Sequence, residues 1–166
     1  SEALILTPVA EDLRTDKCRF GHPVDGRDMK SLVQVVQYAH KKNLIHRDIK
    51  PTNCFFHKDV GFILNDWGSS RLATVKSDVW EGSIGFSVSP KQQQVNNWDD
   101  KVCDLVAVVR TAFVLFCKES PPVNSHESAD GYWGKKIRAG TVWKQALDWA
   151  VAKNYTELEG ALYSLK

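Results

Sequence analysis

Residues 46–53 read His46-Arg47-Asp48-Ile49-Lys50-Pro51-Thr52-Asn53, and after twelve intervening residues the chain reads Asp66-Trp67-Gly68. Two short apolar runs, at 54–56 and 62–64, stand between these motifs on either side of a turn-like stretch, and this pattern predicts a β-hairpin. The start of one strand and the end of the other lie side by side in an antiparallel hairpin. We therefore expect Asn53 and Asp66 at the same end of the hairpin.

The oxygen-bearing side chains of these motifs predict a site for a divalent cation. Asn53 and Asp66 carry hard oxygen ligands that suit Mg²⁺, an ion that keeps several waters and takes further ligands from phosphates. Asp48 would then accept the proton of a substrate hydroxyl, and Lys50 would supply a positive charge for a transferring phosphoryl group. This set of residues favours phosphoryl-transfer chemistry.

Hydrophobic periodicity predicts a mainly α fold around the hairpin. Apolar residues recur at spacings of three and four in residues 28–43, and residues 102–116 are almost entirely apolar, as in a buried central helix. Two shorter amphipathic helices are expected at 142–152 and 157–165. A short buried strand is expected at 3–6, whereas residues 66–100 and 118–134 have no sustained pattern and are expected to be irregular.

Composition limits the classes of function. The chain has 166 residues, 43% hydrophobic and 25% charged, with a formal net charge of +2, which suits one globular domain. No apolar run is long enough to span a membrane, and no basic run indicates a nucleic-acid partner. The beginning of the chain does not resemble a signal peptide, so an intracellular location is expected. The cysteines form no C-x-x-C pair and are expected to be reduced: Cys18, Cys54, Cys103 and Cys117.

The motif at 46–53 resembles the catalytic loop of eukaryotic protein kinases, H-R-D-x-K-P-x-N, and Asp66-Trp67-Gly68 stands in place of the D-F-G of that family. The resemblance implies ATP and Mg²⁺ as cofactors and a protein as substrate. It implies that Asp48 and Lys50 are catalytic, that Asn53 and Asp66 are metal ligands, and that Lys50, Asn53 and Asp66 contact the cofactor.

The same resemblance implies residues that support the loop. His46 and Arg47 belong to the catalytic loop itself. Asp104 matches the aspartate of the family's central helix, which holds the backbone of that loop, and this explains a carboxylate in an otherwise apolar helix. His40 matches a packed structural histidine of the preceding helix.

The resemblance extends along nearly the whole chain. Gly82-Ser83-Ile84-Gly85-Phe86 is similar to the G-T-x-x-Y that closes a kinase activation segment, which assigns residues 66–90 to that segment. Ser89-Pro90 stands near the family's A-P-E, but Lys91 occupies the place of the glutamate, one residue out of register. Because of this departure, the structural ion pair that the family's glutamate makes is not expected to form in the same way here.

The beginning of the chain resembles the casein-kinase-one branch. Residues 7–13, Thr7-Pro8-Val9-Ala10-Glu11-Asp12-Leu13, are similar to the G-P-S-L-E-D-L found just after the hinge in that branch. Residues 1–8 are therefore expected to form the last strand of the small lobe and the hinge, with Ile5 and Leu6 against the cofactor. On this alignment residues 1–166 form an isolated C-terminal lobe without its N-terminal lobe.

Two functions stay open at this point. The first is the large lobe of a serine/threonine kinase, a subgroup that Lys50 indicates, which is weak or inactive until an N-terminal lobe or partner chain covers the hinge side. The second is a pseudokinase-like scaffold without catalysis. The apolar surface left by a missing lobe, with Leu4, Ile5, Leu6 and Trp67 as candidates, would bind a partner or favour self-association.

Arg47 resembles the arginine of a kinase subgroup whose activation segment is often ordered by a phosphate. Hydroxyls are available in that segment, and nothing in the sequence selects among them: Ser69, Ser70, Thr74, Ser77 and Ser83.

Overall fold

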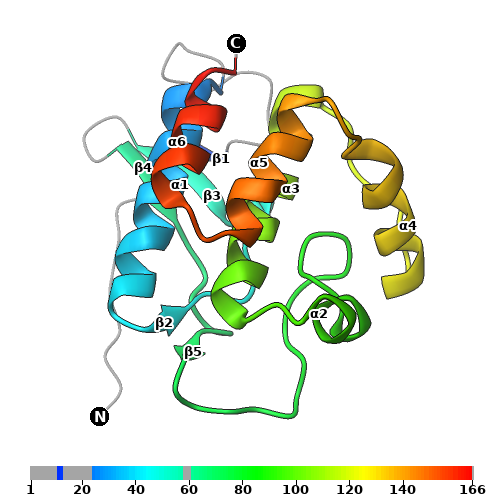
Figure 1. Cartoon of the computed structure of the whole chain (residues 1–166). Helices are drawn as coiled ribbons and strands as arrows, with labels where there is room; N and C mark the ends of the chain where they lie inside the picture. The colour runs from blue at the N-terminus through cyan, green and yellow to red at the C-terminus, as the bar shows by residue number, and fades with distance from the viewer. Residues whose placement is uncertain (1–10, 13–23, 58–60, 166) are drawn as a thin grey trace.

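Residues 11–12, 24–57 and 61–165 are described by a computed structural model of the chain (Figure 1). The helices are α1 (Gly26–Lys41), α2 (Pro90–Asn96), α3 (Asp100–Cys117), α4 (His126–Lys136), α5 (Val142–Val151) and α6 (Tyr155–Tyr163). The strands are β1 (Glu11–Asp12), β2 (Leu44–Ile45), β3 (Cys54–His57), β4 (Gly61–Leu64) and β5 (Arg71–Leu72), and a 3₁₀ turn spans Pro51–Asn53. The expected strand at 3–6, the hinge at 1–8 with Leu4, Ile5 and Leu6, and Cys18 lie outside the described residues.

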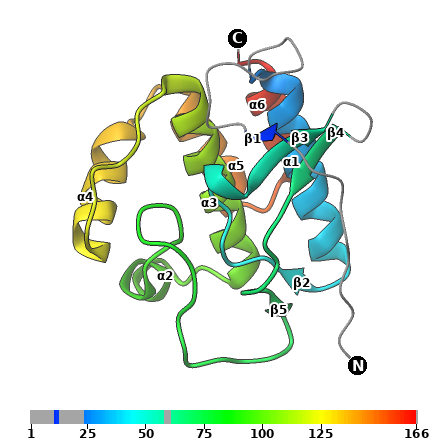
Figure 2. The ribbon, with the colours of Figure 1, turned by 180° about the vertical axis from the view of Figure 1, so that it is seen from behind.

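Helix α3 forms the centre of the domain. Twelve consecutive or near-consecutive side chains between Val102 and Val114 are buried, because the helix is apolar on all sides. Helices α1 and α6 lie side by side, α5 packs against both α3 and α6, and α4 lies at the outer edge (Figure 1). The β3–β4 hairpin packs against α1, as the view from behind shows (Figure 2). The structure confirms a mainly α domain with a small β-hairpin at the catalytic loop.

The hairpin forms where the sequence predicts it. Strands β3 and β4 pair antiparallel with Cys54 opposite Leu64 and Phe56 opposite Phe62, and β1 adds to the outer side of β3. Beyond the last pair, the Asn65 amide donates to the Asn53 carbonyl at 2.8 Å. Asp66 is the next residue, so the hairpin brings the ends of both polar motifs together as expected. A separate two-stranded pairing joins β2 to β5.

The predicted helices are present with shifted ends. Helix α1 begins two residues before the predicted start at 28, because Asp25 caps it by accepting hydrogen bonds from the Arg27 and Asp28 amides. Helices α3 and α5 begin within two residues of the predicted starts, after the N-caps Asp99 and Thr141.

Two segments that were expected to be irregular contain helices. Within 118–134 the structure has the start of α4, which Ser125 caps in a reciprocal pair with Ser128. Within 66–100 it has α2, capped by Ser89 with Pro90 in the first turn. The predictions of irregular structure were wrong here because both helices bury few side chains and therefore show little periodicity: α4 buries Ala129 and Trp133, and α2 buries none.

The described part of the chain contains six helices and three cysteines. None of its helices combines the length and apolar character needed to cross a lipid bilayer. Cys103 and Cys117 form no disulfide with a described residue, and the Cys54 thiol donates to the Lys50 carbonyl at 3.4 Å. Burial raises the pKa of Cys103 to about 12, so this thiol stays protonated at neutral pH.

Helices α1 and α6 approach each other closely at Gly26. A Cβ atom at this position would lie 2.2 Å from the Tyr163 carbonyl oxygen, which belongs to the end of α6. Any larger residue must therefore push the two helices apart. Gly131 in α4 has no neighbour within 4 Å of an added Cβ and offers a matched comparison.

We expect Gly26→Ala to destabilise the domain by about 1–3 kcal/mol through this overpacking, although alanine is the better helix former. Gly131→Ala should stabilise it by about 0.5–1 kcal/mol. Denaturant unfolding followed by far-UV circular dichroism measures both changes, and an equal effect at the two positions would contradict the close contact of α1 with α6.

Candidate functional site

A single buried carboxylate holds the start of the catalytic loop. The Asp104 side chain is 3% exposed and lies on α3. Its Oδ2 accepts from the His46 amide at 2.9 Å and its Oδ1 accepts from the Arg47 amide at 2.9 Å. The carboxylate thus satisfies two backbone donors that the loop would otherwise bury without partners. This is the anchoring contact expected for Asp104.

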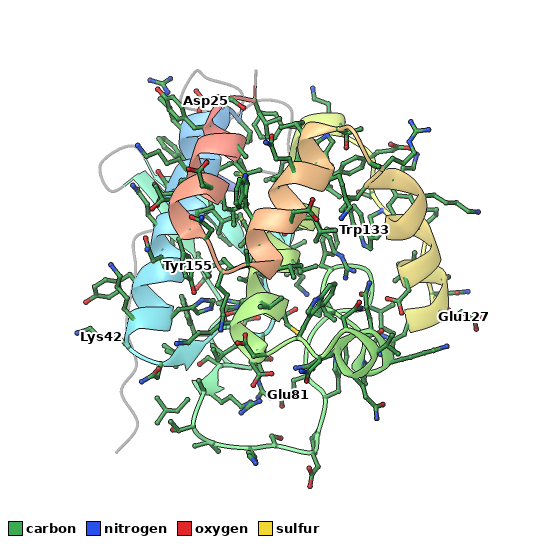
Figure 3. All side chains as sticks on the ribbon, viewed as in Figure 1. Asp25, Lys42, Glu81, Glu127, Trp133 and Tyr155 are labelled. Atoms are coloured by element: carbon green, nitrogen blue, oxygen red, sulfur yellow. The ribbon has the colours of Figure 1, made fainter. Side chains whose placement is uncertain are left out.

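The same carboxylate links the loop to α1 and α6. His40 of α1 is buried and bonds Asp104 Oδ2 through Nε2 at 2.8 Å. Its Nδ1 lies 2.6 Å from the Tyr155 hydroxyl at the start of α6 (Figure 3). Burial raises the pKa of Tyr155 to about 12, so the phenol stays protonated and donates to Nδ1, while Nε2–H donates to Asp104. His40 therefore has the packed structural position that its resemblance implies.

The loop itself is held in a conformation that turns Asp48 toward the activation segment. Arg47 has a φ of 72°, an uncommon value for a residue with a side chain. The Asp48 amide donates to His46 Nδ1 at 3.1 Å, and His46 Nε2 lies 2.9 Å from the Asn65 carbonyl. These two bonds assign the proton of His46 to Nε2 and tie the catalytic loop to the end of the hairpin.

Asp48 and Lys50 meet at a hydroxyl from the activation segment. Ser83 Oγ donates to Asp48 Oδ1 at 2.6 Å and accepts from Lys50 Nζ at 2.7 Å. Lys50 Nζ also lies 3.6 Å from Asp48 Oδ2. The two residues predicted to be catalytic are thus together, and Ser83, named only as one of several hydroxyls from the sequence, joins them. Its signal was the match to G-T-x-x-Y.

Asn53 is positioned so that one side-chain atom stays available. Its Nδ2 donates to the Asp48 carbonyl at 2.8 Å, and the side chain is buried. This bond uses the donor of the amide, and no described residue donates to Oδ1. Asn53 can therefore offer an oxygen to a ligand while remaining fixed to the catalytic loop.

Asp66 stands at the exposed end of β4. It has a φ of 55°, and its Oδ1 accepts a long bond of 3.3 Å from the Gly68 amide. The remaining carboxylate oxygen takes no hydrogen bond from the described residues. An amide oxygen and a carboxylate at the same end of the hairpin are hard ligands, and this donor set fits Mg²⁺. Within the described chain there is no group of three or more His, Cys, Asp or Glu that would hold a metal.

Trp67 packs inward. Its Nε1 donates to the Leu64 carbonyl at 2.9 Å, and its ring meets His46 edge to face at 4.5 Å between centroids. The indole thus contacts the loop histidine. The sequence alone did not decide whether Trp67 packs inward or belongs to an exposed apolar surface.

Arg47 is already paired with an acidic side chain. Its Nη2 donates to Glu81 at 2.6 Å and its Nε donates to the Ser69 carbonyl at 2.6 Å. Both partners belong to the activation segment, whose loop runs below α3 with Glu81 at its edge (Figure 3). Sequence reasoning did not identify Glu81, because a carboxylate in a polar loop carries no signal of its partner.

A cavity of about 680 Å³ lies behind that loop. Arg47, Arg71 and Glu81 line it together with residues of α2 and α3. Arg71 forms an ion pair with Asp100 at the start of α3. Arg71 and Glu81 are thus both in ion pairs on the wall of the cavity.

The end of the activation segment departs from the family pattern, as its sequence indicates. Lys91 is exposed, so it does not replace a buried glutamate. Instead Arg110 of α3 is buried and donates from Nη2 to Gln92 Oε1 at 2.8 Å. Ser89 donates to Asp130 of α4 at 2.8 Å. Sequence reasoning did not identify Arg110 as a contact of the segment.

A helical domain that gathers a carboxylate, a lysine and an amide at the end of a hairpin, with a buried aspartate bonded to the backbone of their loop, has the architecture of a kinase C-terminal lobe. Residues 7–156 match the family described as the protein kinase domain. The chain belongs to the protein kinase superfamily.

Individual relatives agree with this family. The chain is 30% identical over 131 residues to Aurora/IPL1-related protein kinase 2 of Caenorhabditis briggsae, which covers 78% of this chain and 41% of the relative. It is 40% identical over 62 residues to a probable myosin light chain kinase of Dictyostelium discoideum, covering 37% and 11% of the two chains. It is 27% identical over 115 residues to calcium-dependent protein kinase 5 of Plasmodium berghei, covering 68% and 20%. The chain thus spans less than half the length of these relatives.

We expect Asp104→Ala to destabilise the domain by roughly 3–5 kcal/mol, because the His46 and Arg47 amides and the His40 ring would lose their shared acceptor in a buried setting. Thermal unfolding measures this loss. Asp148→Ala provides a control, since Asp148 makes an exposed pair with Lys144 in α5 and its removal should cost less than about 0.5 kcal/mol. A melting temperature unchanged by Asp104→Ala would reject the anchoring role.

Proposed function

We propose that this chain is the C-terminal lobe of a serine/threonine protein kinase, which uses ATP and Mg²⁺ to phosphorylate a protein hydroxyl. The single observation that carries the proposal is the meeting of Asp48, Lys50 and Ser83 at one hydrogen-bonded point. Membership in the kinase superfamily supports the general reaction, and Lys50 two positions after Asp48 supports the serine/threonine subgroup.

Asp48 is proposed to accept the proton of the substrate hydroxyl. Ser83 occupies Oδ1, so Oδ2 is the oxygen left for a substrate, and Lys50 Nζ lies 3.6 Å from it. A lysine at this distance stabilises the carboxylate and offers positive charge to a phosphoryl group that approaches the same point. Ser83 fixes the carboxylate orientation, which a general base needs.

Asn53 and Asp66 are proposed to hold Mg²⁺ beside the phosphates. When bound, the ion neutralises charge that develops on the phosphoryl oxygens. The free Oδ1 of Asn53 and the free carboxylate oxygen of Asp66 are the donors available for it. The hydrogen bond from Asn53 Nδ2 to the Asp48 carbonyl links the proposed metal ligand to the proposed base.

We also propose that an N-terminal lobe, on the same polypeptide or on a partner chain, completes the nucleotide site. Positioning and electrostatics supply nearly all the catalysis of phosphoryl transfer, so one wall of the site alone should be weak by orders of magnitude. The likeness of residues 7–13 to the casein-kinase-one branch supports placing the hinge before them, with Ile5 and Leu6 against the cofactor.

Asp48→Asn should lower phosphotransfer to a protein substrate by about 10²–10⁴-fold, because the amide keeps the shape of the side chain and loses the basic oxygen. Transfer of labelled phosphate, with an N-terminal lobe present, measures the effect. Asp78→Asn, a change at an exposed carboxylate of the activation segment, should leave the rate unchanged. Equal activity of Asp48→Asn and the unmodified chain would remove Asp48 from this role.

Asp66→Asn should weaken binding of Mg²⁺-nucleotide at least tenfold, because it removes the charged metal ligand. Calorimetric titration with Mg²⁺-ATP measures this, and Asp78→Asn again serves as the control. If neither the unmodified chain nor Asp66→Asn binds, the pseudokinase-like scaffold becomes the better description. Equal binding by both would exclude Asp66 as a ligand.

A further inference from the structure

Arg110 is a charged side chain in the middle of the most apolar helix. It is 2% exposed, and burial lowers its pKa to about 10, so the guanidinium stays protonated at neutral pH. It makes no ion pair with any described residue at salt-bridge distance, although the charge of Asp130 acts on it favourably. A buried charge of this kind is costly unless hydrogen bonds compensate it. The hydrogen-bond partners of Arg110 must therefore compensate this cost.

These partners are the Gln92 side-chain oxygen, to which Nη2 donates at 2.8 Å, and two carbonyl groups of the activation segment. Nη1 of Arg110 donates to the Phe86 carbonyl at 3.3 Å and to the Ser87 carbonyl at 3.4 Å. Trp133 of α4, whose ring lies 5.6 Å from the Arg110 guanidinium, donates from Nε1 to the Gly85 carbonyl at 2.6 Å. Three consecutive carbonyls are thus bonded by two buried side chains from two helices.

This short stretch is connected directly to the proposed base. Ser87 Oγ accepts from the Ser83 amide at 3.0 Å and donates to the Arg47 carbonyl at 3.3 Å. The Phe86 and Ser87 amides both donate to the Ser83 carbonyl, at 3.2 Å and 3.0 Å. Ser83 Oγ then donates to Asp48. The path from Arg110 to Asp48 thus runs through these hydrogen bonds and through the covalent structure of Phe86, Ser87 and Ser83.

The backbone conformation of the turn at residues 82–87 is constrained by two glycines. Gly82 has a φ of 147°, and a Cβ there would lie 2.3 Å from Ser87 Oγ. Gly85 has a φ of 108°, and a Cβ there would lie 3.0 Å from Val123. Both glycines are required by their backbone conformation and by close neighbours. The turn from 82 to 87 is therefore packed closely against its neighbours, and Arg110 donates hydrogen bonds to two of its carbonyls.

We propose that Arg110 is a positioning residue that holds the 85–87 backbone so that Ser83 keeps its hydrogen bond to Asp48. The role rests on the proposed function for its catalytic consequence, and on the structure alone for the ordering of the turn. The anchor comes from α3 itself, the helix that also carries Asp104. Arg110 thus anchors the end of the activation segment, where Lys91 stands in place of the family's glutamate and is exposed.

Amide hydrogen exchange, measured by NMR on the whole chain, tests the ordering. Arg110→Met removes the donors and keeps most of the buried volume, and it should speed exchange of the Phe86 and Ser87 amides at least tenfold relative to the amides of α1. Arg110→Lys retains charge and one or more donors, and it should restore part of the protection. Thr111→Val is the control, since the Thr111 hydroxyl is buried on the same helix without a described partner, and it should behave as the unmodified chain.

Two results would overturn the proposal. One is unchanged exchange in residues 82–88 of a folded Arg110→Met protein, and the other is an equal increase throughout α1 and α3, as expected of core packing alone. If Arg110→Met does not fold, Arg110→Lys decides the question, because it keeps the buried positive charge and removes the planar set of donors that reaches the Phe86 and Ser87 carbonyls, so the same amides should exchange faster than in the unmodified chain. Protection retained in that variant would count against the anchor.

Kinetics separate positioning from the proposed reaction. With an N-terminal lobe present, Arg110→Lys should lower kcat about tenfold and leave the KM for nucleotide unchanged, since Ser83 and Asp48 are misaligned while the metal ligands are not. A change in KM alone would contradict the role. Absence of phosphotransfer in the unmodified chain would count against the proposed function, and the exchange result would still decide the role of Arg110.

Discussion

The catalytic loop depends on one buried carboxylate, Asp104. A loop that lies against an apolar helix must bury backbone amides, and each of them needs an acceptor. Asp104 accepts hydrogen bonds from two successive loop amides and from the ring of His40. The other ring nitrogen of His40 accepts a hydrogen bond from the Tyr155 hydroxyl. One side chain thereby connects α3, α1 and α6 to the loop. The cost of burying the charge is offset by these three donors, and the orientation of Asp48 follows from the fixed backbone on either side.

Helix α3 carries a second polar anchor of opposite charge. Arg110 stands six residues after Asp104, which at 3.6 residues per turn places it about 120° round the helix axis. The two side chains therefore face different segments: the carboxylate takes the amides of the catalytic loop, and the guanidinium takes the carbonyls of the turn at 85–87. Each polar group matches the backbone atoms that face it. The proposed base lies where these two fixed backbones meet.

An ion pair within the chain joins the catalytic loop to the activation segment. The resemblance places Arg47 in a kinase subgroup whose activation segment is often ordered by a phosphate, and that remains a prediction. In the structure Arg47 pairs with Glu81 across a sequence distance of 34 residues. This pair joins the loop to the segment just before Gly82 and Ser83, so the turn that contacts Asp48 is held at both of its ends, by Glu81 and by Arg110.

The sequence by itself determined those features that depend on local pattern: the hairpin between the two polar motifs, the helices with strong periodicity, and the anchoring residue Asp104, which is conspicuous in an apolar helix. It did not reveal α4 or α2, because helices with so few buried side chains show little hydrophobic periodicity. Only the tertiary structure decided which hydroxyl meets Asp48, which carboxylate pairs with Arg47, and what Arg110 is for. The physical reason is that a hydrogen bond between residues 23 to 35 positions apart depends on how helices and loops pack, and neither partner carries a mark of the other in its own neighbourhood.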